Sequence, residues 1–296
     1  MYKGIDFVKL PAHIWAIISA VCMLITNIIG IGTPEVTPGL ELVSTDKVIL
    51  EDAMFTGQGI TTDGEYYYTS GAMTGVKMNG LSKRNVSDFS IVKTKLGAIP
   101  EKYVEEHGSN HIGGISYYNG YIYASLEDSK QWQHPVIALY DAETLEYTGI
   151  CHEVSSEILT RGIPWVAVDA ENGFIYASHS KTVEEIHCFD LDTFEYVKSF
   201  AVSDPMDAIQ GGEVYKGKLY VGTNDSTRAV YTIDVKNGKV EKLFDRIMYQ
   251  PKLIDNFGGE GEDLTVYPME DGTLIHALDI GALFIDSNLR HYKWDA

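Results

Sequence analysis

The sequence contains few cysteines and few basic residues for its length. Only 3 of its 296 residues are Cys, so a dense disulfide framework like that of small secreted domains is excluded. Lys and Arg together number 23 against 42 Asp and Glu, which gives a net charge of −19. Nucleic acids and anionic lipid surfaces are bound through clustered basic side chains, so we expect neither as a partner of the body of this protein.

Long apolar runs are also scarce, with one exception near the amino terminus. Residues 14–31 read IWAIISAVCMLITNIIGI and carry no charge, which is close to the shortest length that spans a bilayer. The flank before this run is weakly positive and the flank after it is acidic, which indicates an amino end inside and a body outside. We therefore predict a signal or transmembrane helix within residues 1–32, a linker at 33–46 and an extracytoplasmic protein, either membrane-anchored or secreted.

The rest of the chain is rich in Gly and Tyr, with 28 and 19 residues respectively, and these residues mark a repeat. Five segments share a glycine-containing turn followed by a strand of alternating aromatic or β-branched residues, as in TTDGEYYYTS and DAENGFIYAS. This pattern is typical of tight hairpins. The turn glycines are Gly64, Gly120, Gly173, Gly217 and Gly272.

A second series of turns alternates with the first. In each, an Asp or Asn ends one strand and a few polar residues lead into the next, as in ALYDAETLEYTG. Asp and Asn suit such corners because their side chains accept hydrogen bonds from the backbone two residues on. The corner residues are Asn85, Asp141, Asp190, Asp234 and Asp286.

The two series keep the same phase five times, which predicts an all-β fold of five four-stranded units. Such a unit is a propeller blade, so we predict a five-bladed β-propeller, with six blades as the alternative count. A strand at residues 47–50 would close the ring against the last blade. The propeller would span residues 47–296 and act as a monomer. Its blades are expected at about 54–106, 107–158, 159–206, 207–252 and 253–296.

The third unit, GIPWVAVDAENGFIYASHSKTVEEIHCFDLDTFEYVKSF, resembles the YVTN-type repeat of bacterial extracytoplasmic propellers. The other units are similar more loosely. The resemblance implies the fold and no single activity, since such propellers include binding proteins, lactonases and cyclotransferases. The string FTGQGI at residues 55–60 is faintly similar to the opening motif of glutamine-cyclotransferase propellers.

The first strand of each blade lines the central channel, and ligands bind where these strands begin. Aligning the five first strands places Gln58, Gln210 and Glu262 at the mouth, with His111 close by. Small residues flank each of them, and glycine there would permit close approach of neighbouring backbones. Asn110, Trp165, Glu260 and Asp263 lie near these positions in the sequence.

We predict a polar pocket at this mouth that binds a small molecule, a cation or a protein ligand. Gln58, Asn110, Trp165, Gln210 and Glu260 would contact the ligand. Glu262 and Asp263 could hold Ca²⁺, which prefers carboxylate and carbonyl oxygens. The alternatives are acid–base catalysis by His111 and Glu262 in a lactonase-like or cyclotransferase-like enzyme, and a scaffold that binds proteins on its blade faces.

Two further patterns carry weaker expectations. The second strands end in polar residues, among them Glu127, and we expect these ends at the opposite side of the channel.

Cys151 precedes His152 and His187 precedes Cys188. Neighbouring strand residues point to opposite faces, so free thiols are favoured over a zinc site or a disulfide.

Overall fold

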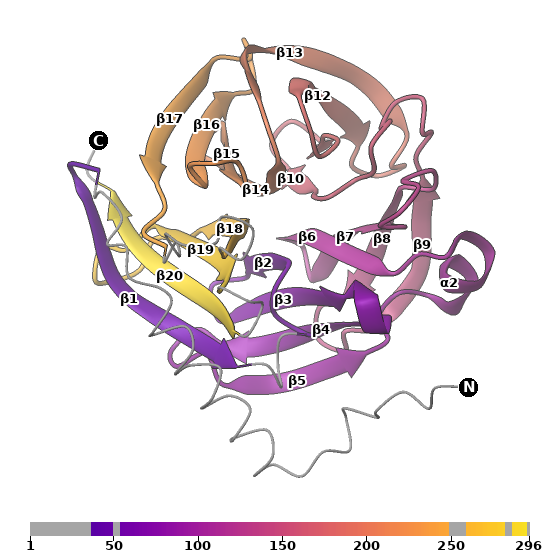
Figure 1. Cartoon of the computed structure of the whole chain (residues 1–296), viewed down its shortest axis with the longest axis horizontal. Helices are drawn as coiled ribbons and strands as arrows, with labels where there is room; N and C mark the ends of the chain where they lie inside the picture. The colour runs from indigo at the N-terminus through magenta and orange to yellow at the C-terminus, as the bar shows by residue number, and fades with distance from the viewer. Residues whose placement is uncertain (1–36, 50–53, 249–258, 282–285, 295–296) are drawn as a thin grey trace.

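Five four-stranded antiparallel sheets stand around a central axis in the computed structural model, which describes residues 37–49, 54–248, 259–281 and 286–294 (Figure 1). The five-bladed β-propeller is therefore confirmed, and the six-bladed alternative is not. The predicted helix within residues 1–32 lies outside the described residues. Among the residues that are described, no helix has the length and apolar character needed to cross a membrane.

The first four blades each use four strands that are consecutive in the sequence. Blade 1 contains β2 (Gly59–Thr62), β3 (Tyr66–Met73), β4 (Met78–Asn85) and β5 (Ile91–Leu96). Blade 2 contains β6 (His111–Tyr118), β7 (Tyr121–Glu127), β8 (Val136–Asp141) and β9 (Tyr147–Glu153). Blade 3 contains β10 (Ala167–Asp169), β11 (Phe174–Ala177), β12 (Val183–Asp190) and β13 (Tyr196–Met206). Blade 4 contains β14 (Ile209–Tyr215), β15 (Lys218–Thr223), β16 (Ala229–Asp234) and β17 (Val240–Asp245).

Blade 5 joins the two ends of the propeller. It contains β18 (Glu260–Val266), β19 (Ile275–Ile280), β20 (Asp286–Trp294) and, as its outermost strand, β1 (Leu40–Ile49). β1 runs antiparallel to β20 from Leu40 opposite Trp294 to Ile49 opposite Asp286, which confirms the predicted ring closure. The closing strand is longer than predicted: it begins at Leu40, within the segment expected to be a linker, and Leu40 and Val48 are buried.

The predicted hairpin turns are present at every repeat. All five turn glycines have positive φ, from 72° at Gly173 to 93° at Gly64, a conformation that residues with a Cβ adopt only under strain. At Asn85 the side chain donates to the Ser90 hydroxyl at 2.8 Å instead of accepting from the backbone. The corner residues of blades 2, 3 and 4 behave as predicted, and Asp141 illustrates them. Its Oδ1 accepts hydrogen bonds from the Thr144 N–H and hydroxyl, each at 2.7 Å.

Asp286 differs from the other predicted corners. It begins β20, which runs unbroken through the segment where a turn between two strands was expected. The physical reason is the ring closure: β1 supplies the fourth strand of blade 5, so the chain does not need to turn there.

Tyrosines fill the spaces between blades, as their number suggested. The rings of Tyr68 in blade 1 and Tyr117 in blade 2 stack with centroids 5.5 Å apart. The buried Tyr68 and Tyr176 hydroxyls donate to Asp63 and Asp169 at 2.8 and 2.9 Å. Each tyrosine thus packs its ring and still satisfies its polar end.

Within the described residues, two short helices lie outside the sheets. The 3₁₀ turn η2 (Thr74–Val76) follows β3, and α2 (Glu101–His107) connects blade 1 to blade 2 at the outer edge of the ring (Figure 1).

Candidate functional site at the channel mouth

A cavity of about 740 Å³ opens where the innermost strands begin. Its wall combines amide, imidazole and carboxyl side chains with a rim of apolar residues. The polar and charged side chains are Gln58, Thr74, His111, Glu127, Ser129, Ser180, Lys181, Gln210, Glu260, Glu262 and Ser287. Four side chains that the strand alignment placed at the mouth, from Gln58, His111, Gln210 and Glu262, therefore line one cavity.

Glycines allow the innermost strands to meet below this cavity. A Cβ added to Gly113 would lie 2.2 Å from the carbonyl oxygen of Pro164 in the next blade, and one added to Gly59 would lie 2.7 Å from the carbonyl oxygen of Gly113. Such distances leave no room for a side chain. The strand pairing is also irregular here, between Ile112 and Ile115 in β6 and between Gly261 and Leu264 in β18. Irregularities of this kind re-aim side chains at a sheet edge.

Asp263 joins three blades at the floor of the mouth. Its Oδ2 accepts hydrogen bonds from the backbone N–H of Ile60 at 3.0 Å and of Ile115 at 3.1 Å, and its Oδ1 accepts one from Leu264 at 2.8 Å. The side chain is fully buried. Burial raises the pKa of this carboxyl well above its ordinary value, although these N–H groups act in the opposite direction.

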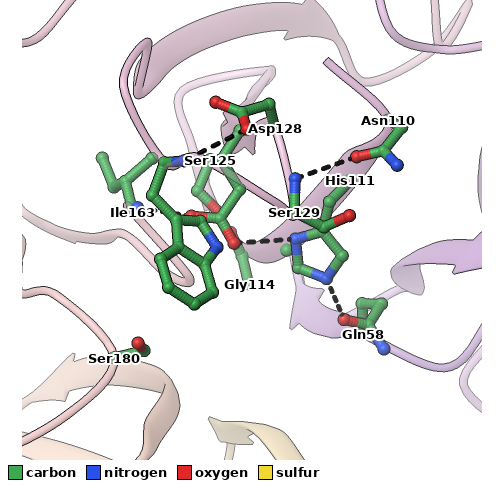
Figure 2. Close-up of polar contacts among 12 residues, drawn as sticks. Gln58, Asn110, His111, Gly114, Ser125, Asp128, Ser129, Ile163 and Ser180 are labelled. Atoms are coloured by element: carbon green, nitrogen blue, oxygen red, sulfur yellow. Dashed lines mark hydrogen bonds and ion pairs between the residues drawn. The ribbon is translucent and has the colours of Figure 1, made fainter. Parts of the chain in front are cut away.

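His111 is held between an amide and a carboxylate (Figure 2). Its Nε2 hydrogen-bonds to Oε1 of Gln58, whose own Nε2 donates to the Gly57 carbonyl at 2.8 Å. On the other side, Nδ1 of His111 lies 3.2 Å from Oε1 of Glu127, without the alignment of a good hydrogen bond. Because the Gln58 oxygen can only accept, Nε2 carries the proton.

Glu127 is itself fixed by the next blade. Its second oxygen accepts the Ile163 N–H at 2.6 Å. The close approach of this carboxylate requires Gly162, since a Cβ there would lie 2.0 Å from Oε2 of Glu127. The pair of Glu127 and His111 is therefore positioned by blades 2 and 3 together.

Two carboxyls form the opposite part of the wall. Glu260 and Glu262 are two residues apart on β18, and their side chains hydrogen-bond to each other. Burial, together with the negative charge of Glu260, raises the pKa of Glu262 well above its ordinary value. Burial also raises the pKa of Glu260, while its contact with Glu262 and the Arg228 charge oppose this change. Burial therefore favours the neutral acid form of the Glu262 side chain, which lines the cavity.

A short loop after β7 forms the rim. Asp128 accepts hydrogen bonds from four backbone N–H groups, those of residues 130 to 133, at 2.5–3.3 Å. Burial raises the pKa of Asp128, but these four donors outweigh it and leave the pKa below its ordinary value. Oδ1 of Asn110 accepts the Ser129 N–H at 3.0 Å on the same loop. The loop places Trp132, which is 37% exposed, at the cavity.

Three residues predicted at the site do not line the cavity. Trp165 is fully buried, and its indole N–H donates to the Ser178 hydroxyl at 3.0 Å, so it belongs to the core between blades. Asp263 lies in the floor, and both of its carboxyl oxygens accept hydrogen bonds from backbone N–H groups. Asn110 supports the rim loop. Their predicted roles toward a ligand or metal remain predictions.

Sequence reasoning missed Glu127 as a member of this mouth. It was expected at the opposite end of the channel, but it pairs with His111 across β6 and β7. In an antiparallel hairpin, the end of the second strand lies beside the start of the first. This rule could have located Glu127 from the sequence, because the turn between the two strands was already predicted.

The fold and the cavity define the class: a five-bladed β-propeller with a polar pocket at one end of its channel. No protein-family model matches the chain, and no curated protein matches it. The motif likeness to YVTN-type propellers therefore stays a prediction.

Among solved structures, the chain is similar to a luciferin-regenerating enzyme, with a TM-score of 0.52, 8% identity, and coverage of 84% of this chain and 95% of that one. At such low identity, the likeness concerns the fold alone. It also matches Kuenenia stuttgartiensis hydrazine synthase, with a TM-score of 0.43, 15% identity, and coverage of 76% and 56% of the two chains. That likeness is too weak to support an argument.

Proposed function

We propose that this protein binds a small, polar, uncharged or cationic organic molecule in the cavity at the channel mouth. The observation that carries the proposal is the convergence of Gln58, His111, Gln210 and Glu262 on one cavity of about 740 Å³. Ligand sites are typically concave and contain a few converging polar groups. The amides of Gln58 and Gln210 offer both donors and acceptors, and the Glu262 acid offers a donor.

The charge of the wall supports the preference for an uncharged or cationic ligand. Glu127, Glu260 and Glu262 line the cavity, whereas Lys181 and His111 are its basic side chains. The indole of Trp132 at the rim adds an aromatic face on which a sugar ring or an ammonium group could pack. An anionic ligand would meet Glu127 and Glu260, whereas Lys181 is the single Lys or Arg among the described lining residues.

A Ca²⁺ site at this mouth has less support. In the described part of the chain, the side chains grouped closely enough to hold a metal ion lie elsewhere in the molecule. A protonated Glu262 would also be a poor ligand for a hard cation.

The test is a thermal-shift screen of the full chain against polyols and sugars, primary amines, lactones and matched carboxylates. A ligand of the native state raises the melting temperature. We expect hits among the uncharged and amine compounds, with affinity reduced at least tenfold by Gln210→Ala. The matched control is Gln131→Ala, because this exposed glutamine is on the rim loop and does not line the cavity. Hits confined to carboxylates, or hits insensitive to Gln210→Ala, would refute the proposal.

Acid–base catalysis in the same cavity is the second candidate, and it has its own observation. His111 lies 3.2 Å from Glu127 at the cavity, and burial together with Glu260 raises the pKa of the Glu262 carboxyl. An imidazole and a carboxylic acid of raised pKa are groups that general acid–base hydrolysis of a lactone would use. Turnover of any lactone or amino-terminal Gln peptide that survives unchanged in both His111→Ala and Glu262→Gln would refute this role.

A further inference from the structure

Three metal-binding side chains meet on the outer edge of blade 2, away from the channel. They are His107 at the end of α2, His134 in the loop before β8 and Glu153 at the end of β9. One ligand atom from each lies within 4.8 Å of the others. Nδ1 of His134 is 2.7 Å from one oxygen of Glu153, and Nε2 of His107 is 3.6 Å from the other.

The two imidazoles are arranged together toward this carboxylate. Their rings stack with centroids 3.9 Å apart and planes inclined by 15°. One imidazole would be enough to pair with Glu153. The second also places a nitrogen near the same carboxylate, so one ligand atom from each of the three side chains lies within 4.8 Å of the others.

The backbones that carry the three ligands are well anchored. Tyr103 of α2 is buried, and its hydroxyl lies 2.7 Å from Sγ of Cys151 on β9. The residue after His134 is Pro135, whose carbonyl accepts the Val154 N–H at 2.7 Å, next to Glu153. The helix, the loop and the strand are thereby held at fixed positions while the ligand side chains remain partly exposed, from 18% for His107 to 44% for Glu153.

We propose that His107, His134 and Glu153 form a Zn²⁺ site that ties α2 to the outer strands of blade 2. Two imidazoles and a carboxylate are a donor set suited to zinc, whereas Ca²⁺ and Mg²⁺ prefer oxygen ligands alone. Tetrahedral zinc with ligand bonds of about 2.0–2.1 Å separates its ligand atoms by roughly 3.3 Å. The observed separations of 2.7 and 3.6 Å are to the two different oxygens of Glu153. Rotation of the stacked imidazoles and of the carboxylate would therefore bring one ligand atom from each side chain to the metal. Three protein ligands leave the fourth position to water.

The test is calorimetric titration of the full chain with ZnCl₂ near pH 7.5, because protons compete with metal ions for imidazole ligands at lower pH. We expect one equivalent of Zn²⁺ to bind, with the melting temperature raised by about 5 °C at roughly one hundred times Kd. Ca²⁺ and Mg²⁺ should cause no shift. Co²⁺ should give the visible absorption of a tetrahedral or five-coordinate site.

We expect the single variant His134→Ala to weaken Zn²⁺ binding at least tenfold and to abolish the Co²⁺ absorption. The double variant His107→Ala/His134→Ala should do the same. The matched control is His152→Ala, since this histidine precedes Glu153 on β9 but is not one of the three converging side chains. The metal-free variants should unfold within a few degrees of the wild type, because the ligands are partly exposed. No Zn²⁺ binding to the wild type, or binding that the His107 and His134 variants retain, would overturn the proposal.

Discussion

The imidazoles of His276 and His291 face each other across β19 and β20, with their Nδ1 atoms 2.6 Å apart. Nε2 of His276 donates to the Tyr267 carbonyl at 2.8 Å, so its Nδ1 accepts the proton of His291. Nε2 of His291 in turn lies 2.9 Å from Oδ2 of Asp46 on β1. This chain of contacts links the last two strands of the chain to the strand that closes the ring.

Acid should weaken the propeller through His276. Burial lowers the pKa of His276 from 6.5 to about 4, so between these values the unfolded chain binds a proton that the folded chain does not. The contribution of His276 to the free energy of unfolding is complete above pH 6.5. It is lost as the pH falls toward 4, and the loss amounts to about 3 kcal/mol. Denaturant unfolding of the wild type and His276→Gln from pH 4 to 8 tests this. The difference in unfolding free energy between the wild type and His276→Gln should change with pH between 4 and 6.5. A constant difference would contradict the lowered pKa of His276.

Glu213 should act with the opposite sign. Burial raises the pKa of Glu213 from 4.5 to about 7, although its bonds to Thr265 and Val266 oppose this. The folded chain therefore retains a proton that the unfolded chain releases, and stability falls as the pH rises from about 4.5 to 7, by about 3 kcal/mol. Glu213→Gln keeps an acceptor for the Val266 N–H, which lies 3.0 Å away. As the pH rises from about 4.5 to 7, Glu213→Gln should become more stable relative to the wild type. If the difference in unfolding free energy between the two proteins stays constant, Glu213 does not titrate in this range.

Gly211→Ala should be among the most damaging single changes in the inner strands. A Cβ at this position would lie 1.8 Å from Oδ1 of Asp263, the carboxylate that joins three blades. Moving Asp263 would leave buried backbone N–H groups unpaired, so we expect a loss of about 3 kcal/mol or more. Gly75→Ala is the control, because a Cβ there meets nothing within 4 Å. Urea unfolding should separate the two variants clearly, and equal midpoints would rule out the close packing at Gly211.

Asp128→Ala should loosen the rim loop while the blades stay folded. The change removes the acceptor of four backbone N–H groups from residues 130 to 133. Amide hydrogen exchange at these residues should accelerate at least tenfold, because no other strong acceptor replaces the carboxylate. Exchange in β7 and β8 should stay within about twofold of the wild type. Protection retained in the loop would mean that Asp128 does not hold it.

Much of the fold could be predicted because its determinants are local. A glycine that must adopt positive φ, as at Gly120, or an Asp that closes a corner, as at Asp190, is specified within a few residues. Repetition of the two signals then indicated five blades and a closing strand. Asp286 was misread as a corner because its context depends on β1, which pairs with it from the other end of the sequence.

The site was only partly predictable, since its side chains come from different blades. The start of each inner strand could be aligned, which brought Gln58, His111, Gln210 and Glu262 together. The irregular pairing between Gly261 and Leu264 breaks the alternation of β18. The usual alternation of side chains along a strand therefore could not predict that Glu262 lines the cavity while Asp263 points into the floor.

The sequence by itself determined the repeat, the turns, the acidic charge and the set of polar residues at the strand starts, because each depends on neighbours along the chain. Only the tertiary structure decided which carboxyl faces which partner. It placed Asp263 on the backbones of blades 1 and 2, and His107 beside His134 and Glu153. The Asp263 contacts depend on how closely neighbouring blades approach one another, which is set by the packing of the whole ring. The histidine contacts depend on where α2 packs against the outer strands of blade 2.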